Sequence, residues 1–353
     1  MEKKFMKGNE AMAEAAIRAG CRFFAGYPIT PQNEIPEYMS RRLPEEDGVF
    51  VQAESEVAAS NMLYGAAATG ARVLTSSTGV GIALKAEGLA HIAAADLPTV
   101  ILNVQRGGQG TGSVQPSQQD YFQATKAPTC GGSKLMVFSP STVQEAIDLT
   151  YNAFDYADEY RNPVMILADA CIGNMMEAVV LPEYKTSIPD KSDWAITGCE
   201  GREARNLSSF KSTDQYVVEQ YNLSMAKMYE TWQEEEVQVE EYMLEDAEVV
   251  IIAHGSIGRF AKFAVKTLLN QGIKAGLIRP ITISPFPYGV IEKLDKDRVK
   301  SILCTEMATP GQMLEDVKIA NKGRIPISFL GHSGGVMVSD EEIVEKVKEI
   351  LGQ

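Results

Sequence analysis

The stretch Ala25-Gly26-Tyr27-Pro28-Ile29-Thr30-Pro31 decides the fold of this 353-residue chain, because it reads as the end of a buried strand that enters a tight turn. The residues from Arg22 to Gly26 show no polar alternation, and Pro31 suits the first turn of a helix. A strand of this kind with a helix directly behind it is typical of parallel sheets, whose ligands gather at the carboxyl ends of the strands. Residues 27–31 are therefore a candidate ligand-binding turn.

The same alternation of strand and helix repeats along most of the chain. In the first part we expect helices at 9–19, 31–42, 57–68, 81–95 and 142–156, and strands at 22–26, 49–53, 72–76, 99–105, 135–138 and 164–167. After polar loops and a long helix near 215–238, we expect strands at 249–253, 274–278, 301–304 and 326–329, and helices at 258–270, 289–294, 311–319 and 340–351.

This pattern predicts an α/β fold with doubly wound parallel sheets. We expect a first domain at residues 1–185 and a smaller α/β domain at residues 247–353. Residues 186–246 read as a connector that packs on the first domain, although the connector could equally belong to either domain.

Composition and charge disfavour several functional classes. A net charge of −14 argues against nucleic acid, whose phosphates require clustered Lys and Arg. The five cysteines form no CxxC pair, so neither a structural zinc site nor an iron–sulfur run is predicted. No stretch is apolar over the length that a membrane span or a secretory signal requires. We therefore expect a cytoplasmic protein with reduced thiols.

Glu56 is the strongest candidate for chemistry. It stands at a predicted helix start, and Gly65 and Gly70 follow it within a run of small residues. A carboxylate there has an ordinary explanation, because it satisfies free amides and the helix dipole. Near the turn 27–31, however, it has the placement that one half of a thiamine diphosphate site needs, in which a glutamate bonds N1′ of the aminopyrimidine. Glu54 is the rival candidate.

These motifs resemble the pyrimidine-binding domain of the 2-oxoacid:ferredoxin oxidoreductases, in which a YPITP turn and a glutamate before an alanine-rich helix recur. The likeness is to the alpha-type subunit and covers nearly the whole chain. It implies a thiamine diphosphate-binding domain of the pyrimidine type, followed by a smaller domain like the C-terminal domain of transketolase. It also implies that Glu56 is catalytic. The implied cofactor-binding residues are Tyr27, Pro28, Ile29, Glu56, Thr78 and Gly79.

Thr30 and Arg106 are candidate substrate-binding residues. Thr30 precedes Pro31 and could simply cap a helix, but its hydroxyl would also suit the carboxylate of a 2-oxoacid. Arg106 follows the strand at 99–105 and opens a glycine-rich loop, where a guanidinium can hold a carboxylate through two hydrogen bonds. Pairing with a surface acid is the alternative for Arg106, and Asp120 at the end of the loop is a weaker candidate. The resemblance implies the substrate-side role for both Thr30 and Arg106.

Residues 75–81, which read Thr-Ser-Ser-Thr-Gly-Val-Gly, follow a strand and open a helix. This invites a dinucleotide-binding interpretation, but Leu84 stands where a third glycine is needed and no acidic residue ends the next strand. A self-sufficient nicotinamide dehydrogenase is therefore disfavoured. We expect a loop near the cofactor pyrimidine, with a structural turn as the alternative. For His254 and for residues 306–312, at later strand ends, we expect packing or an interface rather than chemistry.

The resemblance also implies partners. The sequence has no Gly-Asp-Gly motif with a following Asn to hold Mg²⁺ and the diphosphate, so we expect no metal on this chain. Thiamine diphosphate would be shared with a beta-type subunit that supplies the diphosphate and Mg²⁺ site. A ferredoxin-like subunit would carry iron–sulfur clusters, and a gamma-type subunit, ferredoxin and coenzyme A as co-substrate complete the implied set.

The implied reaction is oxidative decarboxylation of a 2-oxoacid to an acyl-CoA and CO₂, with electrons passed to ferredoxin, in a hetero-oligomeric enzyme of anaerobic metabolism. The matched loops contain no extra Arg or Lys for a second carboxylate, which favours a branched-chain 2-oxoacid, 2-oxoisovalerate, over 2-oxoglutarate. A hypothesis of another class is a noncatalytic scaffold or regulatory α/β subunit.

Overall fold

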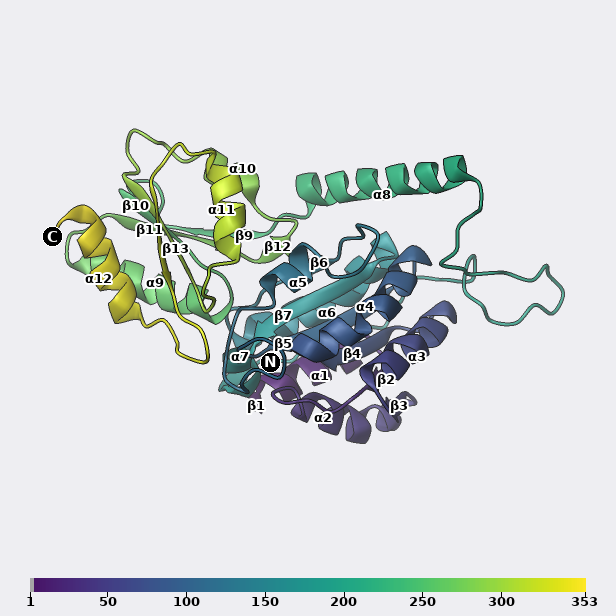
Figure 1. The fold of residues 1–353 in the computed structure, drawn as a ribbon. Helices are drawn as coiled ribbons and strands as arrows, with labels where there is room; N and C mark the ends of the chain where they lie inside the picture. Colours follow the sequence, from purple (N-terminus) through teal and green to yellow (C-terminus); the bar gives the residue numbers. More distant parts are fainter. Residues whose placement is uncertain (1–2) are drawn as a thin grey trace.

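The computed structural model describes residues 3–353 and contains two large β-sheets and one small sheet (Figure 1). The bounds of the strands in the largest sheet are β2 (Phe23–Gly26), β3 (Val49–Gln52), β4 (Val73–Ser77), β5 (Thr99–Gln105), β6 (Met136–Phe138), β7 (Pro163–Asp169) and β12 (Thr282–Ser284). Their order is β12-β6-β7-β5-β4-β2-β3, and all pair in parallel except β12, which is antiparallel to β6. The predicted α/β class with a parallel sheet is confirmed.

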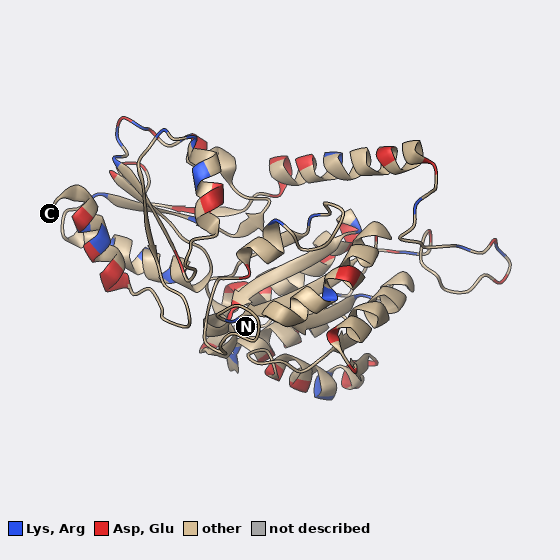
Figure 2. Ribbon diagram, in the orientation of Figure 1, with Lys and Arg blue, Asp and Glu red and all other residues tan. Residues whose placement is uncertain are grey.

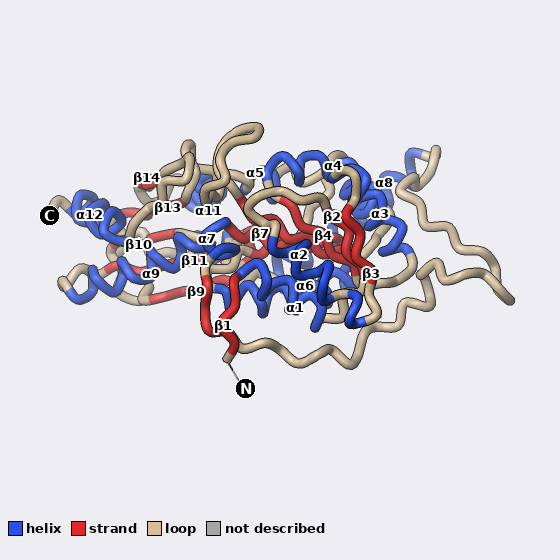
Figure 3. The backbone as a smooth tube through the Cα atoms, turned by 90° about the horizontal axis from the view of Figure 1, so that it is seen from below, coloured by secondary structure: helices blue, strands red, loops and turns tan. Residues whose placement is uncertain are grey.

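Helices cover both faces of this sheet, and Figure 3 shows α4 on one side of the strands with α1 and α6 on the other. One layer contains α3 (Glu56–Ala68), α4 (Gly79–Ala94) and α5 (Tyr121–Thr125), and the opposite layer contains α1 (Gly8–Arg18), α2 (Glu34–Arg42) and α6 (Val143–Tyr160). Along β5, Ile101 packs into the first layer, whereas Val100 and Leu102 pack into the second. The strands read as continuous apolar runs because both of their faces are buried.

The second sheet has the order β14-β13-β10-β11-β9. Its strands are β9 (Val239–Tyr242), β10 (Val249–Ile252), β11 (Ala275–Pro280), β13 (Ser301–Glu306) and β14 (Ile327–Gly331). The helices α9 (Gly255–Asn270) and α12 (Asp340–Leu351) cover one face, and α10 (Tyr288–Glu292) and α11 (Met313–Asn321) cover the other. The domain limits at 185 and 246 remain a prediction, and two strands pair across them, since β9 lies in the second sheet and β12 in the first.

The first elements differ from the prediction in two ways. Helix α2 begins at Glu34 rather than at Pro31, and the residue at its N-cap position is Asn33. Thr30 is therefore not the cap of this helix. In addition, β1 (Lys4–Lys7) pairs antiparallel with β8 (Met176–Val179), a two-stranded sheet that the sequence pattern did not indicate. The short elements η1 (Pro44–Glu46) and α7 (Ala170–Asn174) complete this part of the fold.

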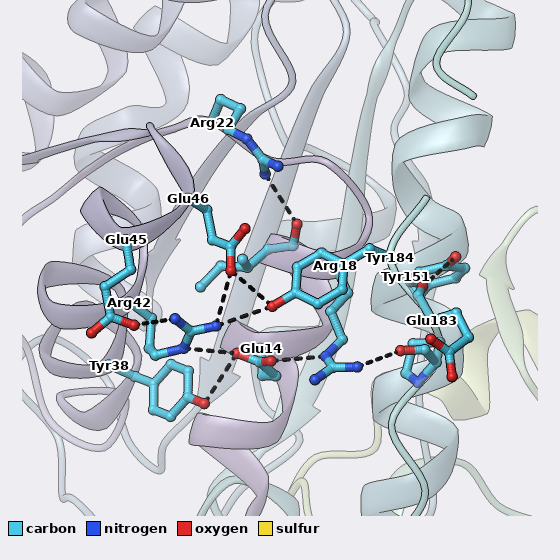
Figure 4. A network of polar contacts seen from close by, with 12 residues as sticks. Glu14, Arg18, Arg22, Tyr38, Arg42, Glu45, Glu46, Tyr151, Glu183 and Tyr184 are labelled. Atoms are coloured by element: carbon cyan, nitrogen blue, oxygen red, sulfur yellow. Dashed lines mark hydrogen bonds and ion pairs between the residues drawn. The ribbon is translucent and has the colours of Figure 1, made fainter. Parts of the chain in front are cut away.

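A polar network attaches the segment after β8 to α1 and α2 (Figure 4). Arg18 donates to the Pro182 carbonyl at 2.8 Å and to the buried Glu14 carboxylate at 2.8 Å. Arg42 donates to the Tyr184 hydroxyl at 3.1 Å. These bonds hold the segment just before the predicted connector on α1 and α2 of the first domain.

Helix α8 (Gln215–Glu235) is part of the predicted connector and leads toward the second sheet. Near its end Trp232 is buried, with its ring edge-on to Tyr160 of α6 at 5.7 Å between centroids. Charged residues occur along the helices, among them α8 and α12 (Figure 2). Within the described part of the chain, no helix combines the length and apolar character needed to cross a membrane.

Candidate active site

The predicted site residues lie together at one edge of the seven-stranded sheet. Thr30 lies in the turn after β2, Glu56 follows β3, Thr78 follows β4 and Arg106 follows β5. These four strands are neighbours and run in parallel, so their carboxyl ends meet at the same edge. The chain order reverses at β2, which has β3 on one side and β4 on the other, and ligands of open α/β sheets bind at such a point.

Glu56 is the first residue of α3 and is only 6% exposed. The Ser55 side chain caps the helix by accepting from the Ala58 amide at 3.1 Å, so the Glu56 carboxylate is not needed for that purpose. None of the hydrogen bonds or ion pairs among residues 3–353 uses this carboxylate. The rival Glu54 is exposed. Of the two acids, Glu56 is the one that is buried and available to a ligand.

Gly81 of α4 provides the space for the Glu56 side chain. A Cβ atom added at Gly81 would lie 2.7 Å from Glu56 Oε1 and 3.3 Å from its Cγ, and closer still to Ser77 Oγ. One helix therefore supports the carboxylate at the start of the other. The glycine is needed because any side chain at this position would displace Glu56 or Ser77.

Unpartnered polar atoms gather where β4 and β5 end. Ser77 Oγ, Thr78 Oγ1 and Asn103 Oδ1 are buried and have no hydrogen-bond partner among the described residues. Buried polar groups are normally satisfied, and each one left over calls for an explanation. Hydroxyl and amide oxygens of this kind beside a buried carboxylate fit the polar edge of a bound heterocycle.

Gly79 forms the turn into α4, with a φ of +43°. Its amide donates to Asp120 Oδ2 at 3.0 Å, and its carbonyl accepts from Gln123 at 3.3 Å. Burial raises the pKa of Asp120, while the bonds from Gly79 and Asn103 and the charge of Arg106 oppose this rise. Asp120 thus anchors the loop of Thr78 and Gly79 from the far end of the Arg106 loop.

Arg106 and Thr30 are brought together, but through the backbone. The guanidinium Nη1 of Arg106 donates to the Thr30 carbonyl at 2.8 Å, and the Thr30 hydroxyl accepts from Asn33 at 3.3 Å. A hollow of about 290 Å³ lies beside them, and it is lined by Thr30, Pro31, Asn33, Glu34, Val114, Gln115, Pro116 and Asn174. Thr30 is exposed and Arg106 is half-buried, so both can reach a ligand.

The other residues of the turn line the approach to this edge. Tyr27 is 39% exposed, Pro28 is exposed and Ile29 is half-buried. The buried Gln32 side chain donates to the Tyr27 carbonyl at 3.4 Å and accepts a bond from Ser76. The turn is therefore fixed to β4 while it presents apolar surface at the open side of the site.

Lys85 is a residue that the sequence pattern did not single out. It lies on α4, is fully buried, and its amine donates to Thr75 Oγ1 at 3.0 Å. Burial lowers the pKa of Lys85 to about 8, and the charge of Glu56 acts in the opposite direction. The available signal was a lysine within an otherwise apolar stretch of helix, which is too weak to show that the lysine is buried.

The C-terminal part of the chain holds the Arg106 loop in place. The Gln118 side chain donates to the His254 carbonyl and accepts from the Met307 backbone amide, each at 2.8 Å. The Gln118 backbone amide donates to the Met307 carbonyl at 3.0 Å. His254 is fully buried, and burial lowers its pKa to about 3, so it is a neutral packing residue. His254 and the segment that begins at Glu306 therefore contact the loop rather than the open edge.

A larger hollow, about 910 Å³, lies elsewhere, between α8, the loop 130–134 and the end of α4 that is remote from Glu56. None of the predicted site residues lines it. Among residues 3–353, no cluster of three or more His, Cys, Asp and Glu side chains could hold a metal ion. The edge with Glu56 is the better candidate site, because it combines a free buried carboxylate with unpartnered polar atoms.

The residues present fit the aminopyrimidine of thiamine diphosphate. Glu56 would hold N1′, and the unpartnered oxygens of Ser77, Thr78 and Asn103 would face the amino group and ring edge. The apolar surface of Tyr27 and Ile29 would cover the ring. The evidence for this fit is the buried Glu56 carboxylate and the unpartnered polar atoms around it.

Comparison with known proteins shows the family of the chain. Residues 14–244 match the family described as "Pyruvate flavodoxin/ferredoxin oxidoreductase, thiamine diP-bdg", and residues 247–343 match "Pyruvate:ferredoxin oxidoreductase core domain II". Ketoisovalerate oxidoreductase subunit VorB of Methanothermobacter marburgensis is 44% identical over 100% of this chain and 99% of its own length. The 2-oxoglutarate synthase subunit KorA of Methanocaldococcus jannaschii is 32% identical over 98% of this chain and 100% of its own length.

Two solved structures share the fold. The 2-oxoglutarate:ferredoxin oxidoreductase of Magnetococcus marinus superimposes with a TM-score of 0.86 at 24% identity, over 99% of this chain and 65% of that chain. A split-gene transketolase superimposes with a TM-score of 0.62 at 14% identity, over 99% of both chains. These structures confirm the predicted fold class. From the two domain matches and the full-length relatives, the chain belongs to the 2-oxoacid:ferredoxin oxidoreductase family.

Proposed function

We propose that this chain is the alpha-type, cofactor-activating subunit of a 2-oxoisovalerate:ferredoxin oxidoreductase. The observation that carries the proposal is the buried, unpaired Glu56 at the carboxyl edge of the sheet, in a chain 44% identical over its whole length to a ketoisovalerate oxidoreductase subunit. When bound and activated, thiamine diphosphate would supply the carbon nucleophile that decarboxylation of a 2-oxoacid needs. Glu56 would hold the proton at N1′ that this activation requires.

Thr30 and Arg106 would orient the substrate carboxylate. The guanidinium of Arg106 keeps further N–H donors beyond the one that bonds the Thr30 carbonyl, and a guanidinium can hold a carboxylate through two of them. Thr78 and Gly79, with Tyr27 to Ile29, would hold the pyrimidine. The Arg106 loop is held by the C-terminal part through Gln118, so substrate binding depends on both parts of the chain.

The lining of the small hollow beside Thr30 disfavours a second substrate carboxylate. It includes Pro31, Val114 and Pro116, and none of its residues, all within the described chain, is Lys or Arg. It also includes Glu34, whose pKa is lowered because the bonds from Lys7 and Asn9 outweigh the effect of burial. A second substrate carboxylate, as in 2-oxoglutarate, would find no cationic residue in this lining, and Lys7 nearby is already paired with Glu34. The 2-oxoglutarate enzyme remains the second candidate, since KorA subunits are 32–33% identical.

We further propose the partners of this enzyme. A beta-type subunit would supply the diphosphate and Mg²⁺ site, a ferredoxin-like subunit the iron–sulfur clusters, and a gamma-type subunit would complete the complex, with coenzyme A as acyl acceptor and ferredoxin as electron acceptor. The support for a beta-type partner is that Glu56 and its neighbours would hold the pyrimidine end of the cofactor, so the diphosphate end needs a site on another subunit. We also propose a cytoplasmic location, because all five cysteines are free thiols.

The first test is coenzyme A-dependent reduction of a viologen dye under anaerobic conditions by the complex purified from its host. Pyruvate, 2-oxoglutarate, 2-oxoisovalerate and an aryl 2-oxoacid would be compared. We expect selective activity with 2-oxoisovalerate. Preference for 2-oxoglutarate would establish the second candidate, and no activity in a complex that contains thiamine diphosphate and iron would favour the scaffold hypothesis.

The second test is Glu56→Gln, with Glu54→Gln as the matched control. We expect Glu56→Gln to abolish turnover while the complex still assembles, because the amide cannot exchange a proton with N1′. Glu54→Gln should remain active, since Glu54 is exposed. If Glu56→Gln kept more than about a tenth of the activity, a general acid–base role for this residue would be wrong.

A further inference from the structure

Gln312 connects the C-terminal part of the chain to a short segment of the first part, residues 119–123. Its side-chain nitrogen donates to the Gln119 carbonyl at 2.8 Å, and its side-chain oxygen accepts from the Phe122 backbone amide at 2.8 Å. Both polar atoms of one side chain are therefore used on one segment. The two bonds fix the backbone on either side of Asp120.

The same segment holds the turn that leads into α4. The Asp120 carboxylate accepts from the Gly79 amide at 3.0 Å, and the Gln123 side chain donates to the Gly79 carbonyl at 3.3 Å. The residues that bond Gln312 thus alternate along the segment with those that bond Gly79. Gly79 adjoins Thr78, whose hydroxyl oxygen is buried and has no partner among the described residues. The segment therefore connects Gln312 to the proposed pyrimidine site.

Gln312 is available for this contact because another residue caps the helix behind it. Gln312 lies at the N-cap position of α11, and its side chain makes no capping hydrogen bond. The fully buried Glu306 carboxylate, at the end of β13, accepts instead from the Met313 and Leu314 amides, each at 3.1 Å. The Gln312 side chain is therefore free of the usual task of a residue at this position and can bond a distant segment.

Attachment of the two parts of the chain does not depend on Gln312. Gln118 makes three hydrogen bonds with the C-terminal part. The Tyr121 hydroxyl donates to the buried Asp316 carboxylate of α11 at 2.6 Å. The two parts should therefore stay together when Gln312 is replaced. What Gln312 adds to these contacts is a fixed position for the backbone beside Asp120.

We propose that Gln312 is a positioning residue for the cofactor site: it holds residues 119–123 so that these keep Thr78 and Gly79 in place to bind the pyrimidine of thiamine diphosphate. Gly79 has a φ of +43°, so the bonds to its amide and its carbonyl help to define the turn. The C-terminal part of the chain thereby affects cofactor affinity. This inference rests on the proposed function, because it assumes that Thr78 and Gly79 bind the pyrimidine.

The test is the dissociation constant of thiamine diphosphate, measured with Mg²⁺ by equilibrium dialysis against the cofactor-free complex. Gln312→Met keeps the length of the side chain but removes both bonds. It should weaken cofactor binding about tenfold, the factor that corresponds to one net hydrogen bond. Gln312→Leu is a second variant in case the first does not assemble. The matched control is Gln233→Met, since Gln233 of α8 donates to the Phe286 carbonyl at 2.8 Å instead, and this control should leave the dissociation constant unchanged.

A double-mutant cycle tests whether Gln312 acts through Asp120. Asp120→Ala removes the bond to the Gly79 amide and should itself weaken cofactor binding. In that variant, Gln312→Met should have a smaller effect than in the wild type, because the bond that Gln312 positions is already absent. Fully additive losses of binding free energy would contradict this route.

Different results would overturn this inference and the proposed function. A wild-type complex that binds the cofactor, beside folded Gln312→Met and Gln312→Leu complexes with the same dissociation constant, would overturn the role of Gln312 alone. A wild-type complex that bound no thiamine diphosphate, or a Glu56→Gln complex with wild-type turnover, would instead overturn the proposed function.

Discussion

Gly81→Ala should strongly lower activity without unfolding the enzyme, because the added methyl group enters the space that the Glu56 and Ser77 side chains occupy. The new Cβ would be 2.7 Å from Glu56 Oε1, whereas ordinary contact begins at 3.4 Å, so restoring ordinary contact moves the carboxylate by about 0.7 Å. The Ser77 hydroxyl is closer still, but it makes no hydrogen bond and can rotate away at little cost. Glu56 is therefore the side chain whose displacement matters most in this substitution.

The expected loss follows from this displacement. Misplacement of a catalytic group by about 1 Å can lower the rate about 100-fold, so we expect kcat for viologen reduction to fall by roughly 30- to 100-fold. Overpacking costs about 1–3 kcal/mol of stability, and replacing a helical glycine by alanine returns about 0.5–1 kcal/mol. The net loss in the free energy of unfolding should therefore stay below about 3 kcal/mol.

The assay compares this variant with Gly65→Ala in the same complex. Gly65 lies in α3, nine residues after Glu56, and an added Cβ there has no atom within 4 Å. This control should keep full activity and gain about 0.5–1 kcal/mol of stability. If a folded Gly81→Ala complex retained activity within about twofold of wild type, the position of Glu56 against α4 would not matter for turnover.

Other contacts give predictions of the same kind. Arg106→Lys should raise the KM for the 2-oxoacid about tenfold or more, with a smaller change in kcat. An ammonium cannot both bond the Thr30 carbonyl and hold a carboxylate as a guanidinium does. An unchanged KM would contradict this role of Arg106. Arg72→Met should lower the free energy of unfolding by about 1–3 kcal/mol in denaturant titrations, since it removes the buried guanidinium bond to Asp158 while Lys191 still pairs with this carboxylate. No measurable loss would count against this expectation. Between pH 8 and 10.5 the wild-type free energy of unfolding should rise by about 3 kcal/mol. The reason is that Lys85 has a pKa of 10.5 in the unfolded chain and of about 8 in the folded chain, so the unfolded chain holds more protons in this window. Lys85→Met should abolish this rise. Equal slopes of stability against pH in the two proteins would refute that expectation.

The strands were predictable because parallel strands buried on both faces need no polar residue in their middle. The strand at 99–105, for example, has the predicted bounds. The meeting of the predicted site residues at one sheet edge followed from chain order, since Thr30, Glu56, Thr78 and Arg106 each come soon after a strand. Their roles remain predictions that the experiments above test.

The elements that were missed are short or are defined by distant partners. β12 has three residues, too few for a periodic pattern, and it exists because it pairs with β6, more than a hundred residues earlier in the chain. Lys85 was missed for a related reason. A sequence does not show that one face of an apolar helix packs on another helix, so a lysine there reads as solvated.

The exchange of strands between the two sheets bears on how such a gene could be divided. A break between residues 246 and 247 would give a first product without β12, which covers the edge of β6, and a second product without β9, which borders β11. Each product would present unpaired backbone N–H and C=O groups, which favour aggregation. Fission at this point would succeed only if the two products found each other again soon after synthesis, even though the family's two sequence domains meet there.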